Sequence, residues 1–421
     1  MSDKKKTPTE KLIELCKNPN QPDIATSLLD AISKGADLNT IVHSNGDVTY
    51  TPLLLACKNN AGLQFIKILL GNGADLNKSS GVWTPLSWLG HNSENREYYE
   101  ILSLFIHSDT LDPNFTDKDG FTYLYDLFPL KETVLEFINF HGHRLKPDII
   151  NARCFNNNST MLLACCRKYN DQDNIKIIRA LLNLGADPNI PGDGNIKDEW
   201  TPLAIIAHSD AISPRYRDDI ITLLINSDRL NPNTYDPRGY SYLYDLNEHP
   251  HLLLEFLIKK GGYIKPAIFN DTVYNDTNDS TLLMFYCYKC TILYNRADAE
   301  STMAENADAA EKIWETSIDT ASLYRDIITI LVTYGANLNI VDKTDRTALD
   351  YLVKSFPEVM PTVINDVLQI YYDIAHFLSQ RGAKTYELVK LTSTPVIKRP
   401  EFNNKGGRRK TRKHKGKKTR K

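Results

Sequence analysis

A recurring stretch, clearest at residues 51–77, constrains the fold of this chain more than any other feature. Thr51 is suited to cap a helix, and Pro52 to occupy its first position, where a missing N–H costs nothing. Apolar residues at helical spacing predict a second helix over 63–70, and Gly73 can take the left-handed conformation that ends it. Two helices this short cannot bury their shared face alone, because isolated helices of about a dozen residues are marginal. The stretch therefore predicts a unit that must stack on neighbours.

Further copies of this opening place the predicted helix pairs along the chain. The cap position recurs 33 residues after Thr51 and then at steps of 38, 38, 41, 40, 40 and 66 residues. These cap residues are Thr84, Thr122, Thr160, Thr201, Ser241, Thr281 and Thr347. An earlier pair is expected over 11–16 and 24–32, and the glycine stop returns at Gly185 and Gly335. About nine units are therefore expected.

A longer repeat is superimposed on these units. The residues Gly-Phe-Thr-Tyr-Leu-Tyr-Asp-Leu at 120–127 return as Gly-Tyr-Ser-Tyr-Leu-Tyr-Asp-Leu at 239–246, which is 119 residues later. The same offset relates Lys146 to Lys265. This offset indicates that a block of three units has been duplicated. Its middle unit lacks the glycine stop, which predicts a helix end made by side-chain hydrogen bonds and proline.

The turn followed by Thr-Pro-Leu, the Ala-rich first helix, the Leu-rich second helix and Gly-Ala-Asp-x-Asn resemble the ankyrin repeat. The resemblance spans roughly residues 10–390 and implies an all-α ankyrin-repeat solenoid, curved, with a capping pair at each end. Three departures are visible: no unit has His after Thr-Pro-Leu, several units exceed the usual length of about 33 residues, and only three units keep the proline. Irregular loops are therefore expected.

The expected organisation has three segments: a flexible amino terminus at 1–10, the solenoid at 11–390, and a linker with a disordered basic tail at 391–421. An acidic, Ala-rich insert at 295–322 falls between the two helices of one unit. A solvated loop or an exposed helix is the favoured interpretation of this insert. The alternative is a docking helix with three apolar contact residues. These are Ile313, Trp314 and Ile318.

Signatures of catalysis and of bound cofactors are absent from the sequence, which has no phosphate loop, HExxH, GxSxG or glycine-rich nucleotide turn. Cys287 and Cys290 form a lone CxxC, without the second pair that a structural zinc site needs, and are interpreted as buried thiols. The histidine pairs at 141–143 and 249–251 are interpreted as loop and cap residues. We therefore expect no enzymatic activity, no cofactor and no metal.

The amino terminus and the cysteines bear on where the protein works. No apolar core follows the first charged residues, so no secretory signal is expected, and no run of about eighteen apolar residues predicts a transmembrane segment. Seven cysteines, an odd number, suit a reducing compartment. A soluble intracellular protein, cytoplasmic or nuclear and monomeric, is expected.

Aromatic residues occupy the position just before the helix cap in five units. They are Tyr50, Trp83, Phe121, Trp200 and Tyr240. By resemblance to the family, this turn tip projects toward the partner-binding side. Large aromatic side chains contribute much of the binding energy of interfaces, so the row suggests a contact surface for a protein. The alternative is that each ring packs on the next turn and stiffens the stack.

The end of each first helix faces the same groove by resemblance to the family. Basic or histidine residues stand there: Lys58, His91, Arg167, Lys168, His208, His249, Lys289 and Lys354. Such a stripe on an acidic body would suit an acidic peptide partner. Ordinary solvated charge is the other interpretation.

The carboxyl-terminal tail is strongly basic. Residues 405–421 contain eleven Lys or Arg and no Asp or Glu, which leaves 39 basic against 52 acidic residues in the rest of the chain. The tail cations singled out are Arg408, Arg409, Lys410, Arg412, Lys413, Lys415, Lys417, Lys418, Arg420 and Lys421. Nuclear import, non-specific nucleic-acid binding and a tether to anionic membranes remain open. The tail is similar to the basic tails of some ankyrin proteins of giant DNA viruses.

The favoured function is a scaffold that binds a protein partner through the concave groove of the solenoid. One alternative is a nucleic-acid-associated or nuclear-targeted protein, whose tail meets nucleic acid or an import receptor. The other is a substrate adaptor for ubiquitin ligation. That adaptor would need a ligase-docking module near the carboxyl terminus, and the predicted helix at 367–378 has no feature that identifies it as one.

Overall fold

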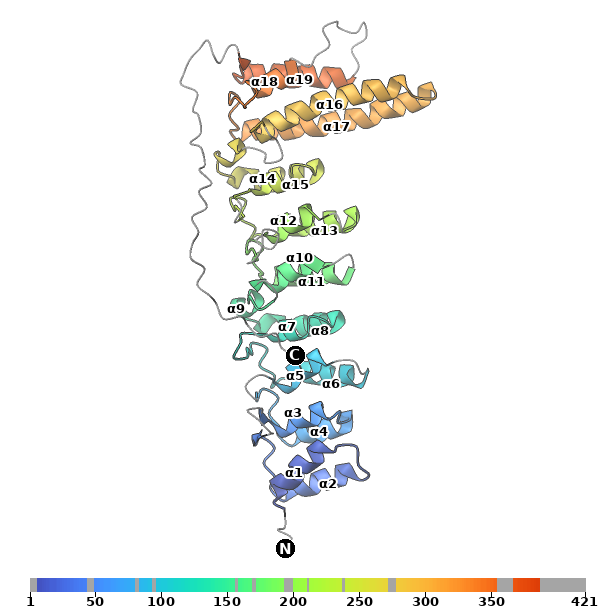
Figure 1. Ribbon diagram of the computed structural model, residues 1–421, viewed down its shortest axis with the longest axis vertical. Coiled ribbons are helices and arrows are strands. Elements are labelled where there is room, and N and C mark those ends of the chain that lie inside the picture. Colours follow the sequence, from blue (N-terminus) through green and yellow to red (C-terminus); the bar gives the residue numbers. More distant parts are fainter. Residues whose placement is uncertain are drawn as a thin grey trace. The chain divides into compact units, whose positions relative to one another are not determined.

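The computed structural model describes eleven segments of the chain. They are residues 6–43, 49–79, 83–92, 96–155, 158–168, 172–192, 200–209, 212–236, 239–271, 278–353 and 366–386. Within them the helices follow one another as nine consecutive pairs, so the all-α prediction is confirmed (Figure 1). The strands β1 (Val42–His43) and β2 (Thr49–Tyr50) form an antiparallel ribbon before the second pair.

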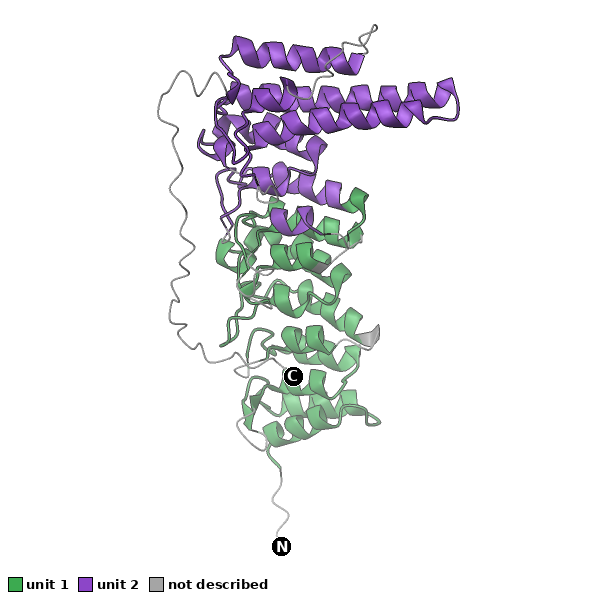
Figure 2. Cartoon of the chain, turned by 45° about the horizontal axis from the view of Figure 1, so that its top comes forward, with its two compact units in different colours: residues 1–202, 210–216 green, residues 203–209, 217–421 purple. Residues whose placement is uncertain are grey.

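The chain divides into two compact units (Figure 2). Unit 1 comprises residues 1–202 and 210–216, and unit 2 comprises residues 203–209 and 217–421. The helix pairs α12 (Pro202–Ala207) and α13 (Pro214–Ile225) lie at the division, with most of their residues in unit 2.

Unit 1 contains five helix pairs among its described residues. They are α1 (Pro8–Lys17) with α2 (Ile24–Ser33), α3 (Pro52–Lys58) with α4 (Leu63–Gly71), α5 (Pro85–His91) with α6 (Arg96–Ile106), α7 (Tyr123–Asp126) with α8 (Lys131–His141), and α10 (Met161–Lys168) with α11 (Gln172–Asn183). The short helices η1 (Gly142–Arg144) and α9 (Pro147–Ile150) separate the last two pairs. First helices pack on first helices, as α1, α3, α5 and α7 do, and second helices on second helices.

Unit 2 continues the same arrangement. After α12 and α13 come α14 (Tyr242–Asp245) with α15 (Pro250–Lys260), α16 (Leu282–Thr302) with α17 (Ala307–Thr333), and α18 (Ala348–Val353) with α19 (Asp366–Gln380). The short helices η3 (Gly261–Tyr263) and η4 (Ile268–Asn270) follow α15. Helix α16 packs on α18, and α17 packs on both α15 and α19.

The predicted helix caps are confirmed by a hydroxyl that accepts a backbone N–H at Thr51, Thr84, Thr122, Thr160, Thr281 and Thr347, whereas Ser241 precedes α14 without a side-chain capping bond. The Thr51 hydroxyl accepts from the Leu54 N–H at 3.2 Å, and Gly73 has a φ of +94° just after α4. The first helix begins at Pro8, earlier than the predicted residue 11, because Thr7 and Glu10 form a capping box. A cap and a stop for each helix pair are therefore specified by local chemistry.

An asparagine that follows several of the helix stops joins one turn to the next. The Nδ2 of Asn77 donates to the Thr110 carbonyl at 2.7 Å, and its Oδ1 accepts from the Asp112 N–H at 2.7 Å. The same pair of bonds is made by Asn39, Asn114, Asn233 and Asn339. One side-chain amide thus satisfies a backbone acceptor and a backbone donor of the next repeat and sets the spacing between successive turns.

We expect Asn77→Ala to lower the free energy of unfolding by about 1–2 kcal/mol, because two backbone groups of the next turn lose their partner. Urea unfolding followed by circular dichroism would measure the change. Asn72→Ala is the matched control, since the Asn72 side chain bonds only the Ile68 carbonyl of its own helix. Equal effects of the two substitutions would contradict the bridging role.

The insert at 295–322 is helical and lengthens both helices of one pair (Figure 1). Helix α16 runs on to Thr302, and α17 begins at Ala307. Of the two forms expected for this insert, the structure therefore shows the exposed helix and not the solvated loop. Trp314 lies with its ring centroid 6.0 Å from that of Tyr294 on α16, and it is half-buried together with Ile313 and Ile318. The acidic side chains from Asp298 to Asp319 are exposed.

All seven cysteines are buried and reduced, as the interpretation of Cys287 and Cys290 as buried thiols requires. Burial raises the pKa of Cys16 to about 12 and raises the pKa values of Cys287 and Cys290 as well. The thiolate is the reactive form of cysteine, so these thiols are unreactive at neutral pH.

Candidate functional site

The aromatic rings at the turn tips lie against the first helices. Tyr50 and Phe121 are buried, each with 8% of its surface exposed, whereas Trp83, Trp200 and Tyr240 are half-buried. Ring packing accounts for this burial. The centroid of Phe121 lies 4.5 Å from that of Tyr125, that of Tyr240 lies 4.5 Å from that of Tyr244, and Trp83 meets Trp88 edge-on at 5.6 Å. The half-buried rings retain surface that a partner can contact.

Histidine and aspartate pair in both copies of the duplicated block. His91 Nε2 lies 3.0 Å from Asp126 Oδ1 in unit 1, and His208 Nε2 lies 3.1 Å from Asp245 Oδ1 in unit 2. Both carboxylates are almost completely buried, and about a quarter of each imidazole side chain is exposed. Each of these histidines is therefore anchored to the next helix pair of its own unit through a buried carboxylate.

The remaining residues of the predicted basic stripe have varied surroundings. Lys58 Nζ lies 2.5 Å from the Tyr50 hydroxyl and 4.2 Å from the Tyr50 ring centroid. The Arg167 guanidinium donates to Ser159 Oγ at 2.8 Å. Lys289 forms an ion pair with Glu248 at 3.0 Å. In these places the stripe thus contacts a ring, two hydroxyls and a carboxylate.

His249 does not stand at the end of a first helix. It is the N-cap residue of α15, the second helix of its pair, and its Nε2 lies 2.8 Å from the Ala207 carbonyl. Burial lowers the pKa of His249, which favours the neutral ring. Lys168 belongs to α10, and Lys354 and the tail cations from Arg408 to Lys421 lie outside the described residues.

A hollow of about 200 Å³ opens on the first-helix side of unit 1. Its lining residues are His91, Tyr125, Phe128, Pro129, Phe155, Ser159, Ala164 and Arg167. They come from α5, α7 and α10 and from the turns that precede or follow these helices. Two of the residues named from sequence, His91 and Arg167, thus line one surface, although 76 positions separate them in the chain.

Three aromatic residues of this hollow escaped the sequence analysis. Tyr125 lies inside the duplicated Tyr-Leu-Tyr-Asp motif. Phe128 comes two residues after the end of α7, and Phe155 lies between α9 and α10. The centroid of Phe155 lies 5.1 Å from that of Tyr125 and 5.0 Å from that of Phe128. The retention of Tyr125 as Tyr244 in the second copy is a signal that could have identified it.

Within the described segments, no group of three or more His, Cys, Asp or Glu side chains could hold a metal ion. In the same part of the chain, no helix combines the length and the apolar character that crossing a bilayer would require.

Comparison with known proteins bears on the fold. Residues 50–80 match the family model of the Ankyrin repeat. The chain forms a mostly helical, ankyrin-repeat-like domain. The matched residues contain β2, α3 and α4 and include residues 51–77, where the repeat is clearest in the sequence. Ankyrin-repeat proteins are typically non-enzymatic scaffolds, and an ankyrin-repeat structure implies a scaffold that binds proteins.

Solved structures of ankyrin-repeat proteins are similar to this chain. EF0377, an ankyrin repeat protein, is 19% identical over 52% of this chain and 98% of its own, with a TM-score of 0.38. The ankyrin repeat domain of human ASB11 is 18% identical over 59% and 96%, with a TM-score of 0.35. The ankyrin repeat domain of Bcl-3, of the IkappaB protein family, is 16% identical over 55% and 92%, with a TM-score of 0.38. No curated protein sequence matches the chain.

Proposed function

We propose that the chain binds a protein partner on the first-helix side of unit 1, with the hollow between α5, α7 and α10 at the centre of the interface. The observation that carries this proposal is the convergence of three aromatic side chains, a histidine and an arginine from three successive repeats on one concave surface. Aromatic residues and arginine are the side chains that contribute most energy at protein interfaces.

The aromatic walls are held in place before any partner arrives. Tyr125 lies between Phe121 and Phe155, with centroid distances of 4.5 and 5.1 Å, and Phe155 in turn contacts Phe128. Side chains that are already ordered lose little conformational freedom on binding. A partner that inserts an apolar side chain here therefore gains contact area at low entropic cost.

The charges beside the hollow favour an acidic partner. The Arg167 guanidinium lines the hollow and donates to the Ser159 hydroxyl, and on an earlier first helix of unit 1 the Lys58 ammonium lies 2.5 Å from the Tyr50 hydroxyl. Complementary charges steer encounter and select among partners more than they add affinity. The partner surface is therefore expected to combine apolar side chains with Asp or Glu.

Affinity capture with the full chain tests the proposal. We expect the double variant Phe128→Ala/Arg167→Glu to retain its specific partner about 10-fold less well than the unaltered chain, because it loses an aromatic contact and reverses a charge. The matched control, Tyr99→Ala/Arg179→Glu, changes an aromatic and an arginine on the second helices α6 and α11. Both control side chains are exposed.

Binding should then be titrated with the captured protein in purified form against each variant. The proposal requires that the control variant bind like the unaltered chain while the hollow variant does not. Equal retention by both variants, or equal loss from both with native thermal stability, would place the interface elsewhere.

A further inference from the structure

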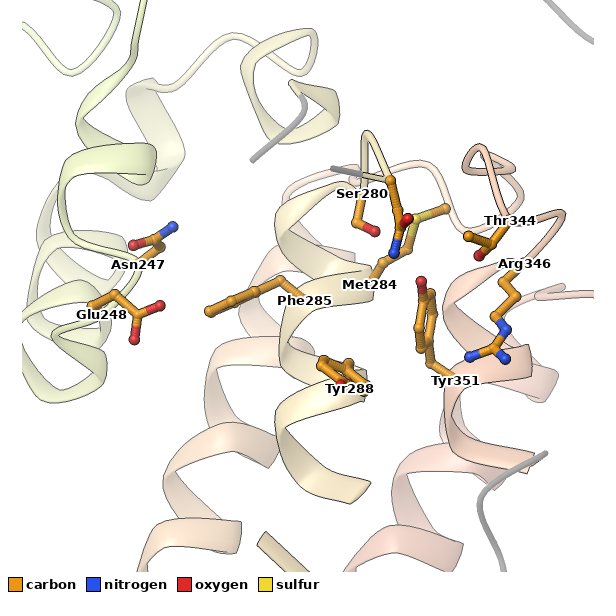
Figure 3. A pocket seen from close by; sticks show the side chains of 10 residues that line it. Asn247, Glu248, Ser280, Met284, Phe285, Tyr288, Thr344, Arg346 and Tyr351 are labelled. Carbon is orange, nitrogen blue, oxygen red and sulfur yellow. The ribbon is translucent and has the colours of Figure 1, made fainter. Parts of the chain in front are cut away.

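A second hollow lies in unit 2, and its chemistry differs from that of the first. Its volume is about 470 Å³. The lining residues are Asn247, Glu248, Asn278, Ser280, Met284, Phe285, Tyr288, Thr344, Arg346 and Tyr351. Figure 3 shows Arg346 beside Tyr351 toward one end and Glu248 toward the other, with Phe285 and Tyr288 projecting from α16 between them. The hollow thus combines three aromatic side chains with polar ones, and it has a cation at one end.

Arg346 is positioned by its neighbours and keeps its side-chain donors available. Its backbone N–H donates to Asp342 Oδ1 at 3.0 Å, and its guanidinium carbon lies 5.3 Å from the centroid of Tyr351. Within the described residues the guanidinium makes no ion pair. A stacked guanidinium retains its in-plane N–H donors, and these match both oxygens of a carboxylate.

The carboxylate that accepts from the Arg346 backbone is also hydrogen-bonded to other donors. Asp342 is buried, and its Oδ1 accepts from the backbone N–H and the hydroxyl of Thr344 at 2.8 Å each. Its Oδ2 accepts from the Tyr351 hydroxyl at 2.5 Å. This carboxylate therefore fixes the ring on which Arg346 stacks rather than neutralising Arg346. The positive charge remains directed at the hollow.

The other side of the hollow is suited to an apolar side chain. Tyr288 is 45% exposed and meets Tyr351 with centroids 5.6 Å apart, and Phe285 is half-buried beside it. At the far rim, Glu248 is paired with Lys289, which also lies 4.8 Å from the Phe285 ring centroid. Exposed aromatic area of this kind is typical of binding surfaces rather than of solvated ones.

We infer that this hollow binds a peptide segment of a protein partner in which an Asp or Glu side chain lies next to an aromatic or large aliphatic side chain. The peptide carboxylate pairs with the Arg346 guanidinium, and the apolar side chain lies against Phe285 and Tyr288. A nucleic acid fits less well, because Arg346 is the only Lys or Arg among the described lining residues, whereas binding of a phosphate backbone relies on several cations. The site shares no residue with the hollow of unit 1, so either site can fail its test without the other.

Selection from a phage-displayed library of random twelve-residue peptides tests the inference with the full chain as bait. We expect enriched peptides to share an acidic residue next to an aromatic or aliphatic one. Synthetic copies should bind Arg346→Ala about 10-fold to 100-fold more weakly, since hydrogen bonds to charged groups are strong. Arg346→Lys should restore only part of the affinity, because an ammonium cannot pair both carboxylate oxygens at once. Tyr288→Ala should weaken binding as well.

Two further variants separate recognition from folding. Arg325→Ala removes the same charge from α17 of the same unit, where the guanidinium contacts only Asp326, and should leave binding unchanged. Glu248→Gln should strengthen binding of the acidic peptides several-fold, because a rim carboxylate that repels them is removed. Thermal unfolding of each variant establishes that it is folded.

Several results would overturn the inference. They are the absence of enriched peptides, enrichment of peptides without an acidic residue, and binding that Arg346→Ala and Arg325→Ala weaken equally. Tighter binding of a fluorescein-labelled duplex DNA than of the acidic peptides, lost in Arg346→Ala, would assign the hollow to nucleic acid instead. Retention of peptide binding by Arg346→Ala together with its loss in Phe128→Ala/Arg167→Glu would transfer recognition to unit 1.

Discussion

Phe137→Ala is expected to lower the free energy of unfolding by about 3–5 kcal/mol. The substitution removes a buried ring and leaves a cavity that the surrounding core fills only in part. Phe137 lies on α8 and is fully buried, with its ring edge-on to Tyr123 at 6.1 Å and 5.2 Å from the His141 ring. Helix α8 packs on α6 and α11, so the cavity weakens the contacts of one repeat with both neighbours. In a repeat array, that loss spreads to adjacent repeats through their shared interfaces.

The duplicated block supplies an internal replicate of this experiment. Phe256 on α15 is the counterpart of Phe137, 119 positions later, and is likewise fully buried with its ring edge-on to Tyr242 at 6.2 Å. Phe256→Ala should therefore cost a similar free energy in unit 2. Hydrogen exchange read by mass spectrometry would locate the loss of protection in unit 1 for Phe137→Ala and in unit 2 for Phe256→Ala.

Tyr99→Ala provides the control, since 45% of Tyr99 is exposed and little apolar surface is uncovered when its ring is removed. The urea concentration at which half of the Tyr99→Ala protein is unfolded should stay close to that of the unaltered chain. A loss of less than about 1 kcal/mol for Phe137→Ala would show that α8 is not part of a packed core.

Features that depend on local chemistry could be predicted from the sequence. Thr51 caps a helix through its own hydroxyl, and Gly73 ends one through its own backbone freedom, so neither requires knowledge of the rest of the chain. The stacking of helix pairs follows, because each pair has an apolar face that it cannot bury alone. The side of each pair that faces a partner was inferred from family resemblance and stays a prediction.

The two hollows proposed as binding surfaces could not be predicted in the same way, because their residues meet only across repeats. Phe155 and Tyr125 are 30 positions apart, and their contact depends on the lengths of α8, η1 and α9 and of the turns between them. His249 illustrates the difficulty at a single position. The short helix α14 ends at Asp245, so His249 caps the next helix instead of facing the groove.

The insert at 295–322 was ambiguous for a different reason. An Ala-rich acidic composition is compatible with an exposed helix and with a solvated loop, and periodicity is weak when one face is only partly buried. What decides is packing along the extension, where Trp314 contacts Tyr294 and where Ser317 and Ala321 are buried against the partner helix. Those contacts join residues on opposite sides of a turn.

Gly90→Ala is expected to destabilise the protein by about 1–3 kcal/mol, the range typical of added atoms in a close-packed site. In most helices the same change is stabilising, because alanine has the higher helix propensity. Gly90 lies on α5, where a Cβ would approach the Asp126 carbonyl oxygen of α7 to 2.8 Å. Backbone atoms cannot rotate away, so α5 and α7 must move apart.

The substitution also joins stability to binding. His91 follows Gly90 on α5, and its bond to Asp126 spans the same contact between α5 and α7. Separation of the helices would lengthen that bond and distort the hollow that His91 lines, so Gly90→Ala should weaken partner capture even at temperatures where the chain remains folded. Gly71→Ala is the matched control. Gly71 ends α4 with open space around it, and the change should stabilise the protein by about 0.5 kcal/mol.

Urea midpoints of the two variants should therefore move in opposite directions, downward for Gly90→Ala and upward for Gly71→Ala. A Gly90→Ala protein as stable as the unaltered chain would mean that first helices do not approach each other as closely as α5 and α7 do here. The hollow of unit 1 would then lack the fixed spacing on which its aromatic walls depend, because His91 and Tyr125 reach it from those two helices.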